Sequence, residues 1–361
     1  MKSEWRTMTL GDVVTLKRGY DLPQQKRIPG NVPVFSSSGI SGYHNTAMAK
    51  GPGVITGRCG TIGQVFFANQ DFWPLNTTLY VENFHGNDPA FVYYFLKTIN
   101  WNTFTSASAV PVINRNTVHK EIVKIPDLRT QRKIASVLKK FDDKIALNNK
   151  INENLEQQAQ ALYREMFLEN QNITTVTKTL NSIAVITMGQ SPSGKSYNED
   201  GIGEVFYQGR AEFGTRFPTR RLFTTEPKRM AEAGDVLLSV RAPVGDLNVA
   251  YEKCCIGRGL AAVHSKIGNN SFILYTMMAS KPRFDVFNGE GTVFGSINRE
   301  SLNTMPIEVP PMEMIVKFED MAHPIDEMIR IRYEENCRLE TLRDTLLPKL
   351  MNGEIDIEDV I

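Results

Sequence analysis

One segment of the chain has the residue types and spacing of a phosphate-binding loop. Residues Gly189–Ser196, with the sequence GQSPSGKS, fit the pattern GxxxxGK[ST] and follow the apolar run Ile183–Met188. Phosphate binding by this motif requires a helix that begins at Lys195, because the N-terminal amides of that helix face the phosphates. The next residues, Tyr197–Gly203, include two glycines and no apolar periodicity, so a loop is predicted there. A P-loop ATPase therefore remains only an alternative interpretation.

No other catalytic pattern stands out in the sequence. The Asn/Asp-Pro-Pro-aromatic motif that holds a flipped adenine in DNA methyltransferases is missing, and so is a Ser/His/Asp nucleophile elbow. The five histidines are scattered, and the four cysteines, Cys59, Cys254, Cys255 and Cys337, have no CxxC spacing. We therefore expect a chain that is not an enzyme, with no catalytic residues, no metal site and reduced thiols.

The composition indicates a globular protein of two or three domains. The 361 residues are 41% hydrophobic and 22% charged, and no run of about 18 apolar residues occurs, so no membrane span and a cytoplasmic location are expected. The net charge of +1 is unevenly spread, because residues 313–361 contain 13 acidic and 6 basic side chains. This asymmetry is compatible with nucleic-acid binding by the more basic remainder of the chain, although a solvated acidic helix is the simpler explanation.

The chain repeats itself, with an offset that grows from 170 to 184 residues along the sequence. The matched segments occur in one order: Thr9–Val14 with Thr179–Ala184, Val34-Phe35 with Val205-Phe206, Gly57–Gly63 with Val240–Gly245, Phe91–Tyr94 with Phe272–Tyr275, Ile113–Arg115 with Ile297–Arg299, and Ile125-Pro126 with Val309-Pro310. Chance would scatter such matches, so a duplication is predicted. The second copy has insertions between residues 190 and 235, where surface loops are expected.

Each copy has the pattern of a mixed α/β domain. Short β-branched and aromatic runs are bounded by Gly, Pro and Asn, as in Val54–Thr56, Gln64–Phe67, Leu79–Val81 and Val236–Val240. A short helix is predicted at Pro89–Thr98 and again at Phe272–Ser280.

A different periodicity follows each copy. Apolar residues alternate steps of four and three, which indicates two long coiled-coil helices of roughly 35–40 residues, or about 50–60 Å. The first seam contains Ile134, Leu138, Phe141, Ile145, Asn148, Asn152, Leu155, Ala159, Leu162 and Met166; the second contains Phe318, Ala322, Ile325, Ile329, Arg332, Asn336, Leu339, Leu342, Leu346 and Leu350. Gly353 is expected at the C-terminal cap of the second helix, and Pro324 at the start of a new helical segment.

Both seams are polar in the middle. Asn148 and Asn152 occupy the centre of the first seam, and Arg332 and Asn336 occupy the centre of the second. Polar seam residues cost stability but fix register and partner, so we expect antiparallel pairing with the polar middles together. The alternative is that these side chains face solvent.

The predicted architecture follows from the duplication and the helices. We expect two globular domains, residues 1–128 and 171–312, related by a pseudo-twofold axis. A spacer helix over residues 129–170 and a second spacer helix with a C-terminal tail over residues 313–361 form an antiparallel coiled coil that separates the domains.

With these features, the sequence resembles the specificity subunit of type I restriction-modification systems. The resemblance covers essentially the whole chain and is carried by the duplication and by the segments Arg58–Gly63, Val240–Asp246, Ile256–Ala262, Leu342–Leu350 and Gly353–Ile355. It implies that each globular domain is a target recognition domain for one half of a split, asymmetric site in double-stranded DNA. The helices would set the spacing of the two halves and bind two modification subunits.

The resemblance also implies which chemistry belongs to the partners. The modification subunits would methylate adenine N6 with S-adenosylmethionine, and restriction subunits would cleave unmodified DNA with ATP and Mg²⁺. This chain would bind no cofactor itself. Two other interpretations stay open: a P-loop ATPase with coiled-coil arms, and a coiled-coil scaffold that binds no DNA.

Candidate DNA contacts lie in the predicted loops. Residues 210–229 of the second copy are rich in basic and aromatic side chains, which can hold phosphates or stack, although a solvated basic loop would look the same. The predicted DNA-binding residues are Lys26, Arg27, Ser36, Ser37, Ser38, Tyr43, His44, Arg58, Lys195, Ser196, Tyr197, Arg210, Phe213, Arg216, Arg220, Arg221 and Arg241.

Two pairs of residues are placed at matching positions by the duplication. Arg58 and Arg241 are expected to share a task, such as holding the DNA backbone near the adenine, or else to form a buried structural ion pair. Asn114-Arg115 and Asn298-Arg299 precede the helices, so a turn-stabilising role is slightly favoured for them.

Overall fold

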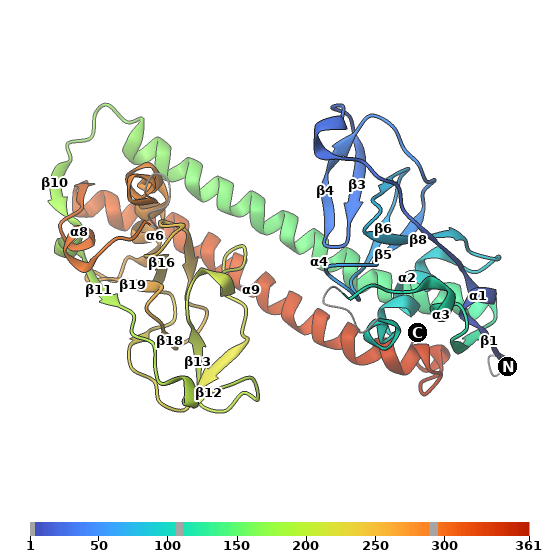
Figure 1. Cartoon of the computed structure of the whole chain (residues 1–361). Helices are drawn as coiled ribbons and strands as arrows, with labels where there is room; N and C mark the ends of the chain where they lie inside the picture. Colours follow the sequence, from blue (N-terminus) through green and yellow to red (C-terminus); the bar gives the residue numbers. More distant parts are fainter. Residues whose placement is uncertain (1–3, 106–110, 289–294, 361) are drawn as a thin grey trace. The chain divides into compact units, whose positions relative to one another are not determined.

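The computed structural model describes residues 4–105, 111–288 and 295–360. The chain divides into two compact units, one formed by Met1–Leu147 with Glu335–Ile361 and the other by Asn148–Glu334. Each unit contains one globular domain together with part of helix α4 (Leu128–Tyr163) and part of helix α9 (Met312–Met351) (Figure 1). Within the described ranges, no helix has the length and apolar character needed to cross a membrane.

Domain 1, in the first unit, contains an antiparallel strand pair, an antiparallel main sheet and a small mixed sheet. Strand β1 (Trp5–Thr9) pairs with β9 (Ile122–Pro126) beside the short helices α1 (Leu10–Val13) and α3 (Arg115–Val118). The main sheet has the order β2 (Thr15–Arg18), β8 (Thr78–Asn83), β5 (Gly53–Gly57), β6 (Val65–Ala68), and the small sheet has the order β4 (Gly39–His44), β3 (Val32–Ser36), β7 (Trp73–Pro74). Helix α2 (Pro89–Lys97) packs on β5 and β6.

Domain 2, in the second unit, repeats this plan with a larger second sheet. Strand β10 (Val176–Thr179) pairs with β20 (Pro306–Val309), next to α5 (Leu180–Ile183) and α8 (Arg299–Asn303). The main sheet has the order β11 (Ala184–Met188), β19 (Leu260–Ser265), β16 (Val236–Ser239), β17 (Leu247–Val249). The second sheet has the order β12 (Tyr197–Asn198), β14 (Leu222–Thr224), β13 (Glu204–Tyr207), β18 (Cys254–Ile256), β15 (Met230–Ala231).

The predicted duplication and mixed α/β fold are confirmed by the matching strand orders. Helices α2 and α6 (Asn270–Ala279) coincide with the two short helices expected from the sequence. Helix α2 begins where Asp88 accepts a hydrogen bond from the Phe91 amide and Pro89 occupies the first turn, which is a typical helix start. Helix α7 (Lys281–Asp285) follows α6 in domain 2.

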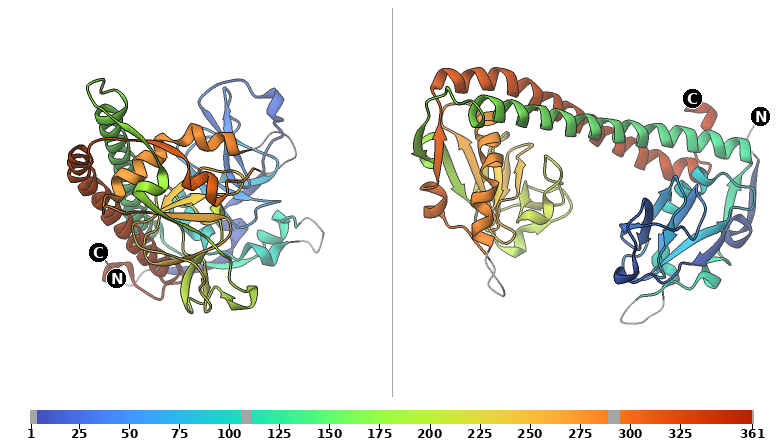
Figure 2. Two further views of the ribbon diagram at one scale, coloured as in Figure 1. Left: turned by 90° about the vertical axis from the view of Figure 1, so that its left-hand side faces the viewer. Right: turned by 90° about the horizontal axis from the view of Figure 1, so that it is seen from above.

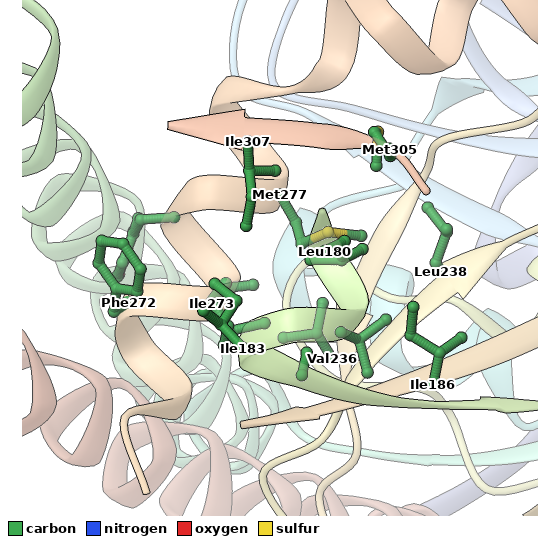
Figure 3. Close-up of a cluster of buried hydrophobic side chains, with 14 of the residues drawn as sticks. Leu180, Ile183, Ile186, Val236, Leu238, Phe272, Ile273, Met277, Met305 and Ile307 are labelled. Carbon is green, nitrogen blue, oxygen red and sulfur yellow. The ribbon is translucent and has the colours of Figure 1, made fainter. Parts of the chain in front are cut away.

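Each domain shares its hydrophobic core with the long helices. In the second unit, side chains from α5, α6, β16 and β20 converge on one cluster (Figure 3). The same cluster contains Ala159 and Tyr163 of α4 and Phe318 of α9. In the first unit, Leu10 and Phe91 of the domain share a cluster with Leu138 of α4 and Leu350 of α9. Burial of this shared apolar surface holds each domain to its helices.

Helices α4 and α9 pair antiparallel within each unit, as the sequence predicts. In the first unit, Asp142 contacts Arg343 and Lys144 contacts Glu335, so residue numbers rise on α4 as they fall on α9. In the second unit, Asn152 Nδ2 donates to the carbonyl of Ile329 at 3.3 Å, and the second half of α4 lies beside the first half of α9 (Figure 2). Asn148 and Asn336 are buried, which contradicts the alternative that these two seam positions face solvent.

Two details of the predicted helices are wrong. Helix α9 continues through Pro324 without a new start, because that residue lies on the exposed face, where water can bond the carbonyl that proline leaves unpaired. Leu342 is 52% exposed, and Arg343 occupies the seam instead. A strict 3.5-residue repeat drifts against a helix of 3.6 residues per turn, which accounts for this shift by one position. The expected cap at Gly353 is confirmed by its φ of 74°.

Candidate nucleic-acid interface

Four loops of domain 1 meet at one end of its sheets. They follow β2, β3, β5 and β7, and we call residues 19–21, 36–38, 58–63 and 75–77 the domain 1 loop cluster. Backbone hydrogen bonds join them: Tyr20 N donates to Pro74 O at 2.8 Å, Leu75 N to Phe35 O at 2.8 Å, and Arg58 N to Thr77 O at 2.9 Å. The cluster is therefore a defined backbone scaffold on which side chains are displayed.

Domain 2 has the same scaffold at the same end. Its loop cluster comprises residues 189–191, 208–210, 240–246 and 257–259, which follow β11, β13, β16 and β18. The three backbone bonds recur: Gln190 N to Ile256 O at 2.9 Å, Gly257 N to Tyr207 O at 2.8 Å, and Val240 N to Gly259 O at 2.9 Å. The two clusters can therefore be compared residue by residue.

A glycine makes the same close backbone contact in both clusters. A Cβ atom on Gly19 would lie 2.2 Å from the carbonyl oxygen of Leu75, and one on Gly189 would lie 2.1 Å from that of Gly257. Real Cβ atoms do not approach backbone oxygens so closely, so only glycine lets these loops pack.

The hydrogen bonds correct the predicted match of Arg58 with Arg241. The amide of Ile113 donates to Arg58 O, and the amide of Ile297 donates to Val240 O, so Arg58 corresponds to Val240. The isolated β-bridges agree with this match, because Cys59 pairs through its backbone with Val112, and Arg241 pairs in the same way with Ser296. Arg241 therefore corresponds to Cys59. The predicted match is wrong by one residue, and such a shift turns a side chain to the opposite face of an extended segment.

The same error affects the match proposed for β3 and β13. Val34 is the register partner of Trp73, and Phe206 is the register partner of Cys255. Val34-Phe35 therefore corresponds to Phe206-Tyr207 rather than to Val205-Phe206. With this register, Ser36 at the end of β3 corresponds to Gln208 directly after β13.

The corresponding side chains differ in charge between the two clusters. Domain 1 has Cys59 and Asn76 where domain 2 has Arg241 and Arg258, and of these residues the sequence predicted a DNA contact only for Arg241. Arg241 and Arg258 are exposed, and no carboxylate in the described part of the chain pairs with either. Arg210 is half exposed and pairs with Asp246, which also contacts Lys281 at 3.2 Å.

The polar groups of the domain 1 cluster bond mainly to one another. Asn76 Nδ2 donates to Asp21 Oδ1 at 2.9 Å, and Ser36 Oγ donates to the carbonyl of Gly39 at 3.0 Å. Arg58 is half-buried, and its Nη1 lies 3.4 Å from the carbonyl oxygen of Asn76. Within the described ranges no carboxylate pairs with Arg58, so the alternative of a buried ion pair is not supported. Ser37 is half-buried and Ser38 is exposed.

The β3–β4 region of domain 1 contains both exposed and buried candidates. Lys26 and Tyr43 are exposed, while Arg27 is half-buried and donates to the carbonyl of Ser41 at 2.7 Å. His44 is 6% exposed, accepts a hydrogen bond from the Ile28 amide at 3.0 Å and packs edge-on against Trp73. His44 therefore belongs to the structural interior and is removed from the candidate DNA contacts.

The basic segment of domain 2 divides into exposed and buried residues. Arg220 pairs with Glu252 and Arg221 with Glu212, and both arginine side chains are more than half exposed. Arg216, in contrast, is 7% exposed and bonds Asp326 of α9. Its guanidinium cannot reach DNA from there, so Arg216 is also removed from the candidate contacts. Phe213 is half-buried and packs on the core under this loop.

The phosphate-loop motif has no helix behind it. Gly194–Ser196 forms a single 3₁₀ turn that leads directly into β12, which confirms the predicted absence of an α-helix at Lys195. Lys195 is exposed, whereas Ser196 is buried against Thr224 at 2.8 Å and is therefore no longer a candidate for DNA contact. Tyr197 donates to the carbonyl of Pro192 at 3.0 Å.

Other predicted sites resolve as structural. Asn114 caps α3 by accepting from the Asn116 amide, and Asn298 caps α8 by accepting from the Ser301 amide, which confirms their turn-stabilising role. All four cysteines are free thiols. Over the described residues, no group of three or more His, Cys, Asp or Glu side chains is arranged to hold a metal ion.

Comparison with known proteins identifies the family. A sequence model described as the type I restriction modification DNA specificity domain matches residues 2–157 and 172–338, which covers both copies of the duplication. The chain belongs to this family. It is a specificity subunit of a type I restriction-modification system with two target recognition domains, as the resemblance implied.

Individual relatives agree with this assignment. A provisionally named type I restriction enzyme specificity subunit, MjaX, of Methanocaldococcus jannaschii is 30% identical over 308 residues, which cover 79% of this chain and 72% of the relative. The HindI specificity subunit of Haemophilus influenzae is 25% identical over 328 residues, covering 68% and 71%. The crystal structure of an S subunit from M. genitalium has the same fold, with a TM-score of 0.62 and 17% identity over 97% and 96% of the two chains.

Proposed function

We propose that this specificity subunit recognises a two-part, asymmetric site in double-stranded DNA, with one half bound at each loop cluster. The observation that carries the proposal is that the two domains have the same backbone scaffold but different side chains on it. One example is Asn76 of domain 1, which corresponds to Arg258 of domain 2. Two identical readers would favour a symmetric site, whereas two different readers require two different half-sites.

The side chains support different base preferences at the two clusters. The exposed guanidinium groups of Arg241 and Arg258 are suited to guanine, because two parallel N–H donors match its O6 and N7 acceptors. In domain 1, the Asn76 amide is suited to adenine, and the Ser38 hydroxyl to several bases. Around these positions, Lys26, Tyr43, Lys195, Arg220 and Arg221 are suited to phosphate contacts, which fix orientation without carrying sequence information.

The long helices support a role in spacing and assembly. Helix α4 has 36 residues, or about 54 Å at ~1.5 Å per residue, which exceeds the ~34–36 Å of one DNA turn. Large apolar side chains are exposed on α4 at Leu147 and on α9 at Met321, Met328 and Ile331. Exposed apolar groups of this kind are typical of surfaces that bind other proteins. We therefore assign the helices to docking two modification subunits.

The chemistry belongs to those partners in this proposal. The modification subunits use S-adenosylmethionine to methylate adenine N6, and restriction subunits use ATP and Mg²⁺ to cleave unmodified DNA. The specificity subunit contributes no catalytic group and binds none of these cofactors. Its work takes place in the cytoplasm, where bacterial and archaeal DNA is found.

A map of N6-methyladenine across the host genome, with and without this gene, tests the proposal. We expect a two-part motif to be methylated in the parent strain and unmethylated after deletion. A deletion strain that keeps every methylated motif would contradict the proposal. Restoring the gene on a plasmid is the matched control, because it separates loss of this chain from effects on neighbouring genes.

A further inference from the structure

Domain 1 is joined to the spacer helices through a tyrosine, an aspartate and an arginine. Tyr94 of α2 donates its hydroxyl to Asp142 Oδ2 on α4 at 2.6 Å, and Arg343 of α9 donates to Asp142 Oδ1 at 2.6 Å. The Arg343 side chain is only 18% exposed, so solvent screens this ion pair weakly. All three residues belong to the domain's own helix α2 or to the spacer, and none lies in a recognition loop.

Domain 2 keeps the tyrosine and the aspartate at corresponding positions. The Val92 amide bonds Asp88 O in α2, and the Ile273 amide bonds Asn269 O in α6, so Tyr94 corresponds to Tyr275. The strand pairs Thr9 with Ile122 and Thr179 with Pro306 fix the register of the helices that follow. Asp142 then corresponds to Asp326, and Tyr275 Oη donates to Asp326 Oδ1 at 2.8 Å.

The arginine, however, comes from a different place. In the same register, Arg343 corresponds to Ala159 of α4, a fully buried residue without a polar side chain. The cation beside Asp326 is instead Arg216, which lies in the loop between β13 and β14. Domain 1 has no matching loop, because β3 passes directly into β4 through a tight turn.

The surroundings of Arg216 connect that loop to both spacer helices. Its Nη2 bonds Asp326 on α9, while its Nη1 lies 3.7 Å from Glu156 Oε2 on α4, too far for a hydrogen bond but close enough for charge attraction. The Tyr275 ring lies 5.7 Å from the guanidinium carbon. Burial raises the pKa of Glu156, and the nearby positive charge of Arg216 opposes that shift.

The residues beside Arg216 hold the loop in the same place. The Phe217 ring packs 4.8 Å from Tyr333 of α9 and 5.7 Å from Tyr251, centroid to centroid. On the domain side, the amide of Val249 donates to Arg216 O at 2.9 Å, and Asn248 bonds both the amide and the carbonyl of Gly214. The loop is thus fixed to the sheet of domain 2 and to the spacer at once.

We infer that Arg216 is a positioning residue for DNA recognition by domain 2. The loop it holds also carries Arg210, Arg220 and Arg221, whose side chains are more than half exposed. Contacts made by these three arginines therefore depend on a buried ion pair with the spacer. In domain 1 the corresponding ion pair lies outside the recognition loops, so docking and recognition are separate there. The inference rests on the proposed function of the loop clusters.

The variant Arg216→Met tests this coupling in the full chain assembled with its modification subunits. We expect hydrogen exchange of residues 208–221 to accelerate by about tenfold or more, and discrimination against base changes in the domain 2 half-site to fall by about tenfold. Discrimination at the domain 1 half-site should not change. Arg343→Met is the matched control: it should lower the melting temperature while leaving discrimination at both half-sites intact.

A second variant guards against a folding defect, because Arg216→Met leaves the Asp326 carboxylate buried without its cation. In Arg216→Met with Asp326→Asn, that carboxylate is gone, and the same selective loss is expected in a chain of near parental stability. Equal losses at both half-sites, or parental discrimination despite faster loop exchange, would overturn the inference. If the unaltered complex showed no two-part preference at all, the proposed function itself would fail.

Discussion

Domain 1 and domain 2 display different chemistry on one backbone scaffold. Both loop clusters use the same backbone hydrogen bonds and the same close glycine contact, yet cysteine and asparagine in domain 1 stand where domain 2 has Arg241 and Arg258. The difference shows that the conformation of the loops does not depend on the side chains that they display. Backbone bonds and glycines hold them, so side chains at these few positions are free to differ without loss of the fold.

The largest expected effect comes from breaking the shared scaffold in one domain at a time. Gly189→Val places a side chain against the Gly257 carbonyl, and Gly19→Val places one against the Leu75 carbonyl. Each should destabilise its own domain by about 3 kcal/mol. Hydrogen exchange resolved by domain measures this. Gly194→Val is the control, since no atom lies within 4 Å of that site; equal effects from all three variants would contradict the comparison.

A smaller effect is expected from removing side chains without disturbing the backbone. Arg241→Ala and Arg258→Ala should each cost about 1–3 kcal/mol in DNA binding and relax specificity at one position of the domain 2 half-site. Asn76→Ala should act on the domain 1 half-site only. Binding of the assembled complex to duplexes with single base changes measures both. A uniform loss across all duplexes, with a reduced salt dependence, would instead assign these side chains to phosphate.

The comparison also shows what sequence patterns can and cannot predict. The duplication, the mixed fold and the two long helices follow from local periodicity and repeated segments, and all were predicted. The pairing of Arg58 with Arg241 was wrong, because short matched segments with gaps between them leave the register uncertain by one residue. The backbone bonds of Ile113 and Ile297 remove that uncertainty.

Sequence patterns also could not predict which charged side chains are buried. Arg216 is of the same residue type as the exposed arginines near it in the sequence. Only the fold brings it into contact with Asp326, which is 110 residues away in the chain. The same holds for His44, whose polar type suggested a base contact and whose partner is a backbone amide. Residue type indicates what a side chain can bond, whereas long-range packing decides whether solvent or DNA can reach it.

The helix pair of the second unit has polar seam residues, and the expected effect of replacing them is smaller again. Asn152 uses its amide nitrogen to bond the carbonyl of Ile329, while no described group bonds its buried Oδ1. Replacing Asn148 and Asn152 with leucine should increase helix-pair stability by about 1 kcal/mol but loosen the register. Solution scattering should then show a broader distance distribution or a change of oligomeric state. An unchanged scattering profile would contradict a register role.

The smallest expected effect is a pH response of domain 1. Burial lowers the pKa of His119, whose Nε2 accepts a hydrogen bond from the Leu16 amide at 2.9 Å, while the corresponding residue of domain 2 is Asn303. The unfolded chain therefore takes up a proton first as pH falls below ~6.5, and the stabilisation is lost progressively on acidification. Hydrogen exchange at pH 7.5 and 5.5 should show domain 1 weakening by less than about 1.4 kcal/mol per pH unit.

The control for this response is the residue that domain 2 already uses. His119→Asn removes the titrating group, so the weakening of domain 1 on acidification should largely disappear. If domain 1 of this variant weakened on acidification as much as the parent, another group would have to be responsible.

The most direct test of independent recognition by the two domains is a map of N6-methyladenine in three strains. One strain carries the unaltered gene, one carries Arg241→Ala with Arg258→Ala, and one carries Asp21→Ala with Asn76→Ala. We predict that the two variants relax opposite halves of the methylated motif and leave the other half unchanged. Relaxation of the same half by both variants, or of both halves by either one, would contradict the assignment of one half-site to each loop cluster.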